Sequence, residues 1–212
     1  MTAPPAGAAA ATLSQGADKR ERILEAATDQ FAAKGLAGAR VDEIARAAQV
    51  NKQLVYYYFG GKLGLYNEVL GHMIEESRQK IDAEAACETL AERMALLTRS
   101  GTHPNSVRWQ RLLGWEALEA NPDDGEIIRE EDRRGAWQRH LASVLEAQQS
   151  GEVDPELDPE ALALALVSIA ILPFMLPQVT KFITGKRPAD EELLERYEAL
   201  VGQLVAHLRV SA

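Results

Sequence analysis

The sequence is poor in the residues that mark several large classes of protein. It has one cysteine, Cys87, in 212 residues, which excludes an internal disulfide framework and suits a reducing compartment. Its nine prolines and 15 glycines give no sign of a collagen-like or low-complexity chain. The most apolar stretch, 161–176, is interrupted by Pro173 and is too short and too rich in alanine to predict a membrane span.

The first 17 residues lack charge altogether. They have neither a basic start nor a leucine-rich core, so they do not predict a secretory signal. Because they are rich in alanine, proline and glycine, we expect a disordered tail at 1–17. We expect the protein to be cytoplasmic, with no membrane partner.

The chain also lacks the residue clusters of an enzyme or a metal site. Its four histidines are scattered, and no two of them lie four residues apart. Neither a glycine-rich phosphate loop nor a serine elbow is present. We therefore predict no catalytic residues, no bound metal and no cofactor.

Charge is unevenly distributed along the sequence. The net charge is −9, but residues 18–62 contain eight basic and six acidic side chains, a net charge of +2. The remaining residues from 63 to 212 carry −11. A slightly basic segment joined to an acidic one fits a protein that contacts DNA at one end only, although +2 over 45 residues is also ordinary.

Apolar residues recur with helical spacing along most of the chain, which predicts an all-α protein. We expect about nine helices, near residues 18–34, 41–48, 52–59, 62 onward, 83–99, 104–120, 123–149, 159–185 and 188–210. Gly35, with its access to positive φ, should end the first helix, and Asn51 should cap the third. Two short helices joined by a turn and braced by a third are the parts of a helix-turn-helix DNA-binding domain.

The same segment resembles the tetracycline-repressor (TetR) family of bacterial regulators. The matching positions are Arg22, Ile23, Leu24, Ala26, Ala27, Phe31, Gly35, Val41, Ile44, Ala45, Ala48, Val50, Tyr56, Tyr58, Phe59, Lys62 and Leu65. The resemblance implies a homodimer with a helix-turn-helix DNA-binding domain at 18–62 and a C-terminal ligand-binding and dimerisation domain at 63–212. It implies no cofactor.

Three positions depart from the family pattern. Arg40 replaces the usual Thr or Ser before Val41, which removes a hydroxyl cap worth about 1 kcal/mol but brings a cation to a possible phosphate contact. Gln49 replaces a glycine, so it should carry the strain of a positive φ. Asn51 replaces Ser or Thr, an exchange of one favourable cap for another.

The third helix should lie in the major groove and present its N-terminal side chains to base edges. Lys52 and Gln53 are the expected base readers, and Tyr56 is expected to contact a thymine methyl group or a phosphate. By resemblance, Tyr58 and Lys62 bind phosphates. We expect Tyr57 and Phe59 to pack inside. The predicted DNA-binding set is Arg40, Asn51, Lys52, Gln53, Tyr56, Tyr58 and Lys62.

The helix at 104–120 carries tryptophans on one apolar stripe, with the carboxylate of Glu116 on the same stripe. Tryptophans that merely fill a core would give the same pattern. The resemblance implies a ligand pocket here, for an apolar or aromatic small molecule. Its expected lining is Trp109, Leu112, Leu113, Glu116, Trp137, Phe174 and Met175.

The last two predicted helices are too apolar to be covered by one chain. The helix at 159–185 is apolar on all sides, and the helix at 188–210 has one broad apolar stripe. We expect these helices, at about 159–184 and 190–210, to form a homodimer, although a monomer with the first of them at its centre is an alternative.

Together these features predict a ligand-responsive regulator, most simply a repressor that binds a palindromic operator in double-stranded DNA. An activator of the same fold is the main alternative. Two others are a helical small-molecule enzyme, for which Glu116 alone would have to supply the acid or base, and an interaction protein whose helix-turn-helix binds another helix.

Overall fold

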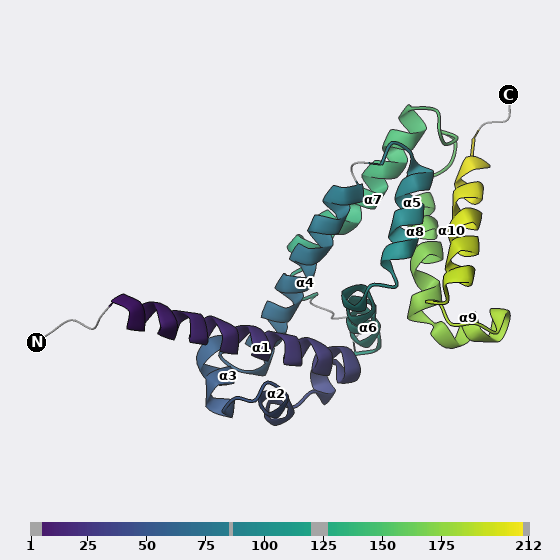
Figure 1. Ribbon diagram of the computed structural model, residues 1–212. Coiled ribbons are helices and arrows are strands. Elements are labelled where there is room, and N and C mark those ends of the chain that lie inside the picture. Colours follow the sequence, from purple (N-terminus) through teal and green to yellow (C-terminus); the bar gives the residue numbers. More distant parts are fainter. Residues whose placement is uncertain (1–5, 85–86, 120–126, 210–212) are drawn as a thin grey trace, which may run out of the picture. The chain divides into compact units, whose positions relative to one another are not determined.

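A computed structural model describes residues 6–84, 87–119 and 127–209 of the chain (Figure 1). Over these ranges the protein is helical and has no strand, which confirms the all-α class. There are ten helices in the described residues, where about nine were expected. The chain divides into two compact units, and the division falls after His72 and after Gly114.

The first unit contains the N-terminal helices. They are α1 (Ala6–Gly38), α2 (Val41–Ala47), α3 (Lys52–Phe59), the start of α4 (Lys62–Glu84) and the end of α6 (Pro104–Glu119). Ile23, Ala27 and Phe31 lie four residues apart on α1 and are fully buried. The ring of Phe31 meets Tyr66 of α4 edge to face at 5.0 Å, and the Tyr66 hydroxyl donates to Glu116 Oε1 at 3.0 Å.

The start of α1 differs from the sequence prediction. Residues 1–5 of the expected disordered tail lie outside the described residues, whereas residues 6–17 continue the helix. The physical reason is the run of alanines, since alanine has the highest intrinsic helix propensity. Gly35 has a positive φ of 69°, as expected, and interrupts the helix three residues before its end.

The second unit contains the rest of α4 and α6 together with five further helices. They are α5 (Leu90–Ser100), α7 (Glu130–Gln149), α8 (Pro159–Met175), α9 (Pro177–Thr184) and α10 (Glu191–Ala206). Helix α5 packs against α8 and α10, as Figure 1 shows, and α7 packs against α8. Buried side chains of these helices, among them Met94, Val144, Leu166, Val201 and Val205, form the core.

The predicted helix at 159–185 is two helices. Leu176 leaves the helical conformation, with φ −122° and ψ 65°, and α9 begins at Pro177. A proline disfavours the helical conformation in the residue before it, which explains the break at Leu176. Pro173 remains inside α8. No single described helix is long and apolar enough to cross a membrane. Helices α8 and α9 reach that length and apolar composition only when taken together, and the chain bends by 85° between them.

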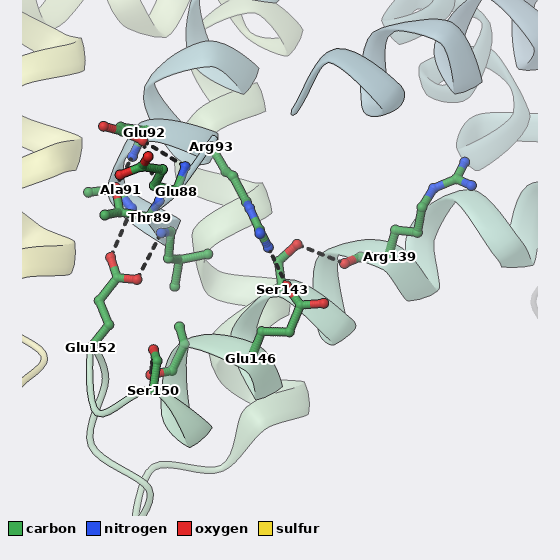
Figure 2. A network of polar contacts seen from close by, with 12 residues as sticks. Glu88, Thr89, Ala91, Glu92, Arg93, Arg139, Ser143, Glu146, Ser150 and Glu152 are labelled. Carbon is green, nitrogen blue, oxygen red and sulfur yellow. Dashed lines mark hydrogen bonds and ion pairs between the residues drawn. The ribbon is translucent and has the colours of Figure 1, made fainter. Parts of the chain in front are cut away.

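A polar network fixes the N-terminus of α5 (Figure 2). Thr89 and Glu92 form a capping box, in which each side chain accepts a hydrogen bond from the other residue's backbone. The carboxylate of Glu152, from the loop between α7 and α8, accepts from the backbone N–H groups of Leu90 at 3.0 Å and Ala91 at 3.3 Å. The loop is therefore anchored to the positive end of the α5 dipole.

Candidate nucleic-acid interface and body cavity

The turn between α2 and α3 is held by backbone geometry that the sequence predicted. Gln49 has a positive φ of 54°, so it carries strain that a glycine would avoid. The Asn51 side chain accepts a hydrogen bond from the backbone N–H of Gln53 at 2.9 Å, as expected of an N-cap. This turn fixes the direction in which α3 leaves α2.

Helix α3 has one buried face and one exposed face. Val55 is fully buried and Phe59, one turn later, is 7% exposed, which confirms the prediction for Phe59. The prediction that Tyr57 packs inside is wrong, because its side chain is 80% exposed. Val55 and Phe59 lie four residues apart and define the inner face, so Tyr57 falls on the opposite side of the helix.

The exposed face of α3 brings together most of the predicted DNA-contacting side chains. Lys52, Gln53 and Tyr56 are exposed, and Tyr58 is half-buried with its ring packed edge-on against Tyr57. Sequence reasoning missed Tyr57 as a member of this face. The helical period of 3.6 residues, counted from Val55, is the signal that would have identified it.

Lys52 is held by a neighbour on α2. Its ammonium group forms an ion pair with Asp42 and lies 6.0 Å from the centre of the Tyr56 ring. The hydrogen bond between the two groups is the main cause that lowers the pKa of Asp42 and raises the pKa of Lys52. Both side chains are therefore charged at neutral pH, and Asp42 takes up one donor of Lys52 and neutralises part of the positive charge that it would bring to DNA.

Arg40 and Lys62 lie at helix ends. Arg40 is the exposed N-cap residue of α2, in extended conformation, and its side chain makes no capping hydrogen bond there. Lys62 donates hydrogen bonds to the carbonyl oxygens of Ala37 at 3.0 Å and Ala39 at 2.9 Å. Lys62 thus secures the chain at the end of α1, a role that the sequence did not reveal.

The second unit contains a cavity of about 100 Å³, which we call the body cavity. Among its lining residues are Met73, Glu76, Leu97, Asn105, Trp109, Gln110, Leu113, Arg133, Trp137, His140 and Ile171. The guanidinium of Arg133 lies over the Trp109 ring, 5.4 Å from its centre. The rings of Trp137 and His140 are 5.8 Å apart.

The polar groups of this cavity are mostly paired. Asn105 donates to both carboxylate oxygens of Glu76, at 3.0 and 2.8 Å. Burial, and secondarily the charge of Arg139, lowers the pKa of His140, so its imidazole is neutral at pH 7. Gln110 is 7% exposed, and its Oε1 has no hydrogen-bond partner among the described residues.

The structure brings only part of the predicted ligand set together. Trp109, Leu113 and Trp137 line the body cavity. Phe174 lines a separate apolar cavity of about 160 Å³ between α8, α9 and α10. The others lie elsewhere: Leu112 is fully buried in packing, Glu116 accepts the hydrogen bond from Tyr66, and Met175 lies close to Gly114. The α6 residues of the set were grouped because they share one stripe of that helix. Along this stripe, however, the helix packs against different neighbours, so its side chains have different surroundings.

Within the described ranges, no group of three or more His, Cys, Asp or Glu side chains is placed to hold a metal ion. The arrangement offers instead an exposed polar helix on a braced support and an aromatic cavity in the second unit.

Two parts of the chain match known protein families. Residues 23–69 match the family described as bacterial regulatory proteins, tetR family. Residues 91–206 match the family described as tetracyclin repressor-like, C-terminal domain. The second match alone covers more than half of the chain.

Individual proteins agree with these matches. The chain is 32% identical over 167 residues to the HTH-type transcriptional repressor SCO4008 of Streptomyces coelicolor, covering 78% of this chain and 83% of that protein. The crystal structure of SCO4942 from the same species is 26% identical, with a TM-score of 0.68 over 92% of this chain and 99% of that one. FadR from Bacillus subtilis, crystallised with stearoyl-CoA, shares the fold at 18% identity, with a TM-score of 0.66 over 88% of this chain and 97% of that one.

Proposed function

Because the chain belongs to the tetracycline-repressor (TetR) family of bacterial regulatory proteins, we propose that residues 18–62 are its DNA-binding domain and that residues 63–212 bind ligand and dimerise. The chain is a helix-turn-helix transcriptional regulator. The observation that carries the proposal is the exposed face of α3, whose polar side chains stand on a helix anchored by Val55 and Phe59.

We propose distinct roles for the side chains of this interface. Lys52 and Gln53, in the first turn of α3, read base edges in the major groove, where lysine suits guanine and glutamine suits adenine. The remaining members of the set position the protein on the phosphate backbone or support α3, namely Arg40, Asn51, Tyr56, Tyr58 and Lys62. Lys62 can contact a phosphate as well as the carbonyl oxygens of Ala37 and Ala39, because an ammonium group has three donors.

The proposed active form is a homodimer built on α8, α9 and α10, at about 159–184 and 190–210. Large apolar side chains on these helices are exposed in the single chain, including Leu164 at 70%, Leu172 at 50%, Leu200 at 48% and Leu204 at 43%. A second copy would cover this surface. Two α3 helices about 34–36 Å apart would then meet successive major grooves of a palindromic operator.

The regulator is proposed to be a repressor that a small apolar or aromatic effector releases from DNA, and to act in the cytoplasm without catalysis. Helix α4 is continuous from Lys62, beside the DNA-binding helices, to Met73 and Ile74, which line the body cavity. An effector can shift DNA affinity only to the extent that it binds one conformation of this connection more tightly than the other.

The test is selection of DNA by the purified protein from random duplexes, followed by titration of the selected site and a scrambled duplex at several salt concentrations. We expect an inverted repeat. Lys52→Ala and Gln53→Ala should relax sequence preference, whereas Lys62→Ala should weaken binding to both duplexes and reduce the salt slope by about 0.9 for one lost phosphate contact. Selection of no sequence, with equal binding to both duplexes, would contradict the proposal. An unchanged salt slope for Lys62→Ala would remove only its phosphate role.

A further inference from the structure

We infer that the body cavity takes an uncharged, planar aromatic ligand that offers a hydrogen-bond donor and acceptor along one edge. The inference rests on the proposed function, because it names the chemical class of the effector. Three features of the cavity carry it: the two indoles in its wall, a buried amide oxygen without a partner, and a balance of charge among its ionisable groups.

The indoles favour a flat ring system. Trp109 and Trp137 come from different helices, α6 and α7, and both line the cavity. Trp137 keeps 37% of its residue surface exposed, so the chain itself does not cover this side chain fully. Aromatic rings pack most favourably against other planar rings in offset or edge-on arrangements, which selects a planar guest over a branched aliphatic one.

The buried amide oxygen of Gln110 favours a ligand with a polar edge. Its side chain is more than nine-tenths buried, it lines the cavity, and its Oε1 accepts no hydrogen bond from the described residues. A buried polar group without a partner is costly, so a ligand that supplies the missing hydrogen bond gains affinity. A ligand N–H supplies the donor that this oxygen lacks, and an acceptor beside it on the ligand faces the NH2 group of the same amide.

The charges of the cavity favour a neutral guest. Glu76 and Arg133 contribute one negative and one positive charge, and each already has an interaction: Asn105 donates to the carboxylate, and the guanidinium lies over Trp109. Burial keeps His140 uncharged by lowering its pKa. A ligand ion would add a charge with no counter-ion of its own in a partly desolvated space, which opposes its binding.

A series of probes with one bicyclic frame separates these requirements. The full-length protein is titrated with 2-quinolinone, which is neutral with a lactam edge, and with naphthalene, 2-naphthoate and N-methylquinolinium, which are apolar, anionic and cationic. Calorimetry gives the affinities, and quenching of tryptophan fluorescence reports the site, since two of the three tryptophans line the cavity. We expect 2-quinolinone to bind about ten-fold more tightly than naphthalene and than either ion.

Variants assign the selectivity to Gln110. Gln110→Leu should weaken 2-quinolinone about ten-fold and leave naphthalene unchanged or tighter, since it replaces a lone polar group with an apolar one. Gln138→Leu is the matched control, because it makes the same change at an exposed position of α7 outside the cavity lining, and it should alter neither affinity. Gln110→Met repeats the test if the leucine variant folds poorly.

The possible results separate an error in the ligand class from an error in the proposed DNA-binding function. Tighter binding of 2-naphthoate or N-methylquinolinium than of 2-quinolinone overturns the assignment of a neutral ligand. Equal binding of naphthalene and 2-quinolinone, or no effect of Gln110→Leu, overturns the polar edge. If none of the probes binds while the same protein still selects operator DNA, the ligand class is wrong and the regulator stands. Failure to bind DNA overturns both.

Discussion

Asp42 is expected to restrain the DNA-binding surface, and its replacement gives a direct test. The Asp42 carboxylate pairs with Lys52, a proposed base reader, and adds a negative charge to a surface meant for phosphates. The Asp42→Asn substitution keeps the size of the side chain and removes the charge. We therefore expect it to release Lys52 and to strengthen binding to all DNA at low salt.

The magnitude follows from counting ionic contacts. If the positive charge that Asp42 no longer neutralises displaces one more counterion from the DNA, the slope of log K against log salt concentration should become steeper by about 0.9. Over a change from about 50 to 200 mM salt, that slope costs the variant about a further three-fold in affinity. Because the added binding is independent of sequence, the ratio of operator to scrambled affinity should fall.

Salt titrations of both duplexes by fluorescence anisotropy supply the measurement. A double-mutant cycle gives the control, since Asp42→Asn should lose most of its effect when Lys52 is already glutamine. If Asp42→Asn has the same effect with Lys52 present and with Lys52→Gln, it acts through the overall charge of the surface and not through Lys52. If the salt slope and affinities stay at their original values, the restraint argument is refuted.

Two further predictions concern the second unit. Glu152→Ala should lower the free energy of unfolding by about 1 kcal/mol, a fall in Tm of about 2–4 °C, because two N–H groups of α5 lose their acceptor. Glu156→Ala, on the same loop and exposed, should change Tm little, and equal losses would argue against the cap. The pKa of His140 is lowered in the folded state, so its contribution to stability is complete above about pH 6.5 and declines as the pH falls below that value, where the unfolded chain takes up the proton first. Arg139 beside it, and Arg93, Arg133 and Glu76 in the cavities it lines, share its surroundings. Urea titrations from about pH 5 to 8 should show His140→Gln flattening this decline, and an unaltered pH profile would exclude His140 as its source.

Local features of the structure were predictable where their cause lies within a few residues of sequence. The bounds of α3, Lys52–Phe59, agree with the sequence because Asn51 supplies a cap and the helix ends before Gly60. The positive φ of Gln49 was predicted from a family turn in which glycine is usual. Pro173 and Pro177 predict a kink in the helix expected at 159–185, and the structure breaks this helix at Leu176, directly before Pro177.

Features set by distant parts of the chain were not predictable in this way. No spacing in the sequence indicates that the Glu152 carboxylate accepts hydrogen bonds from the backbone N–H groups of Leu90 and Ala91, which lie more than 60 residues away. Likewise, a glutamine between Trp109 and Leu112 has the same sequence neighbours whether its amide meets water or lies buried beside a cavity.

Lys62 has contacts within the protein in addition to the phosphate contact that the family resemblance implies. The resemblance marks Lys62 as a phosphate contact, and the structure shows its ammonium group on the carbonyl oxygens of Ala37 and Ala39. These roles are compatible, because a lysine held by two of its donors presents the third with little remaining freedom. A side chain fixed in this way loses less entropy on contacting a phosphate than an unrestrained one. In the proposed phosphate role, the carbonyls of Ala37 and Ala39 position the cation for DNA, so a substitution at Lys62 should affect both the stability of the first unit and its affinity for any duplex.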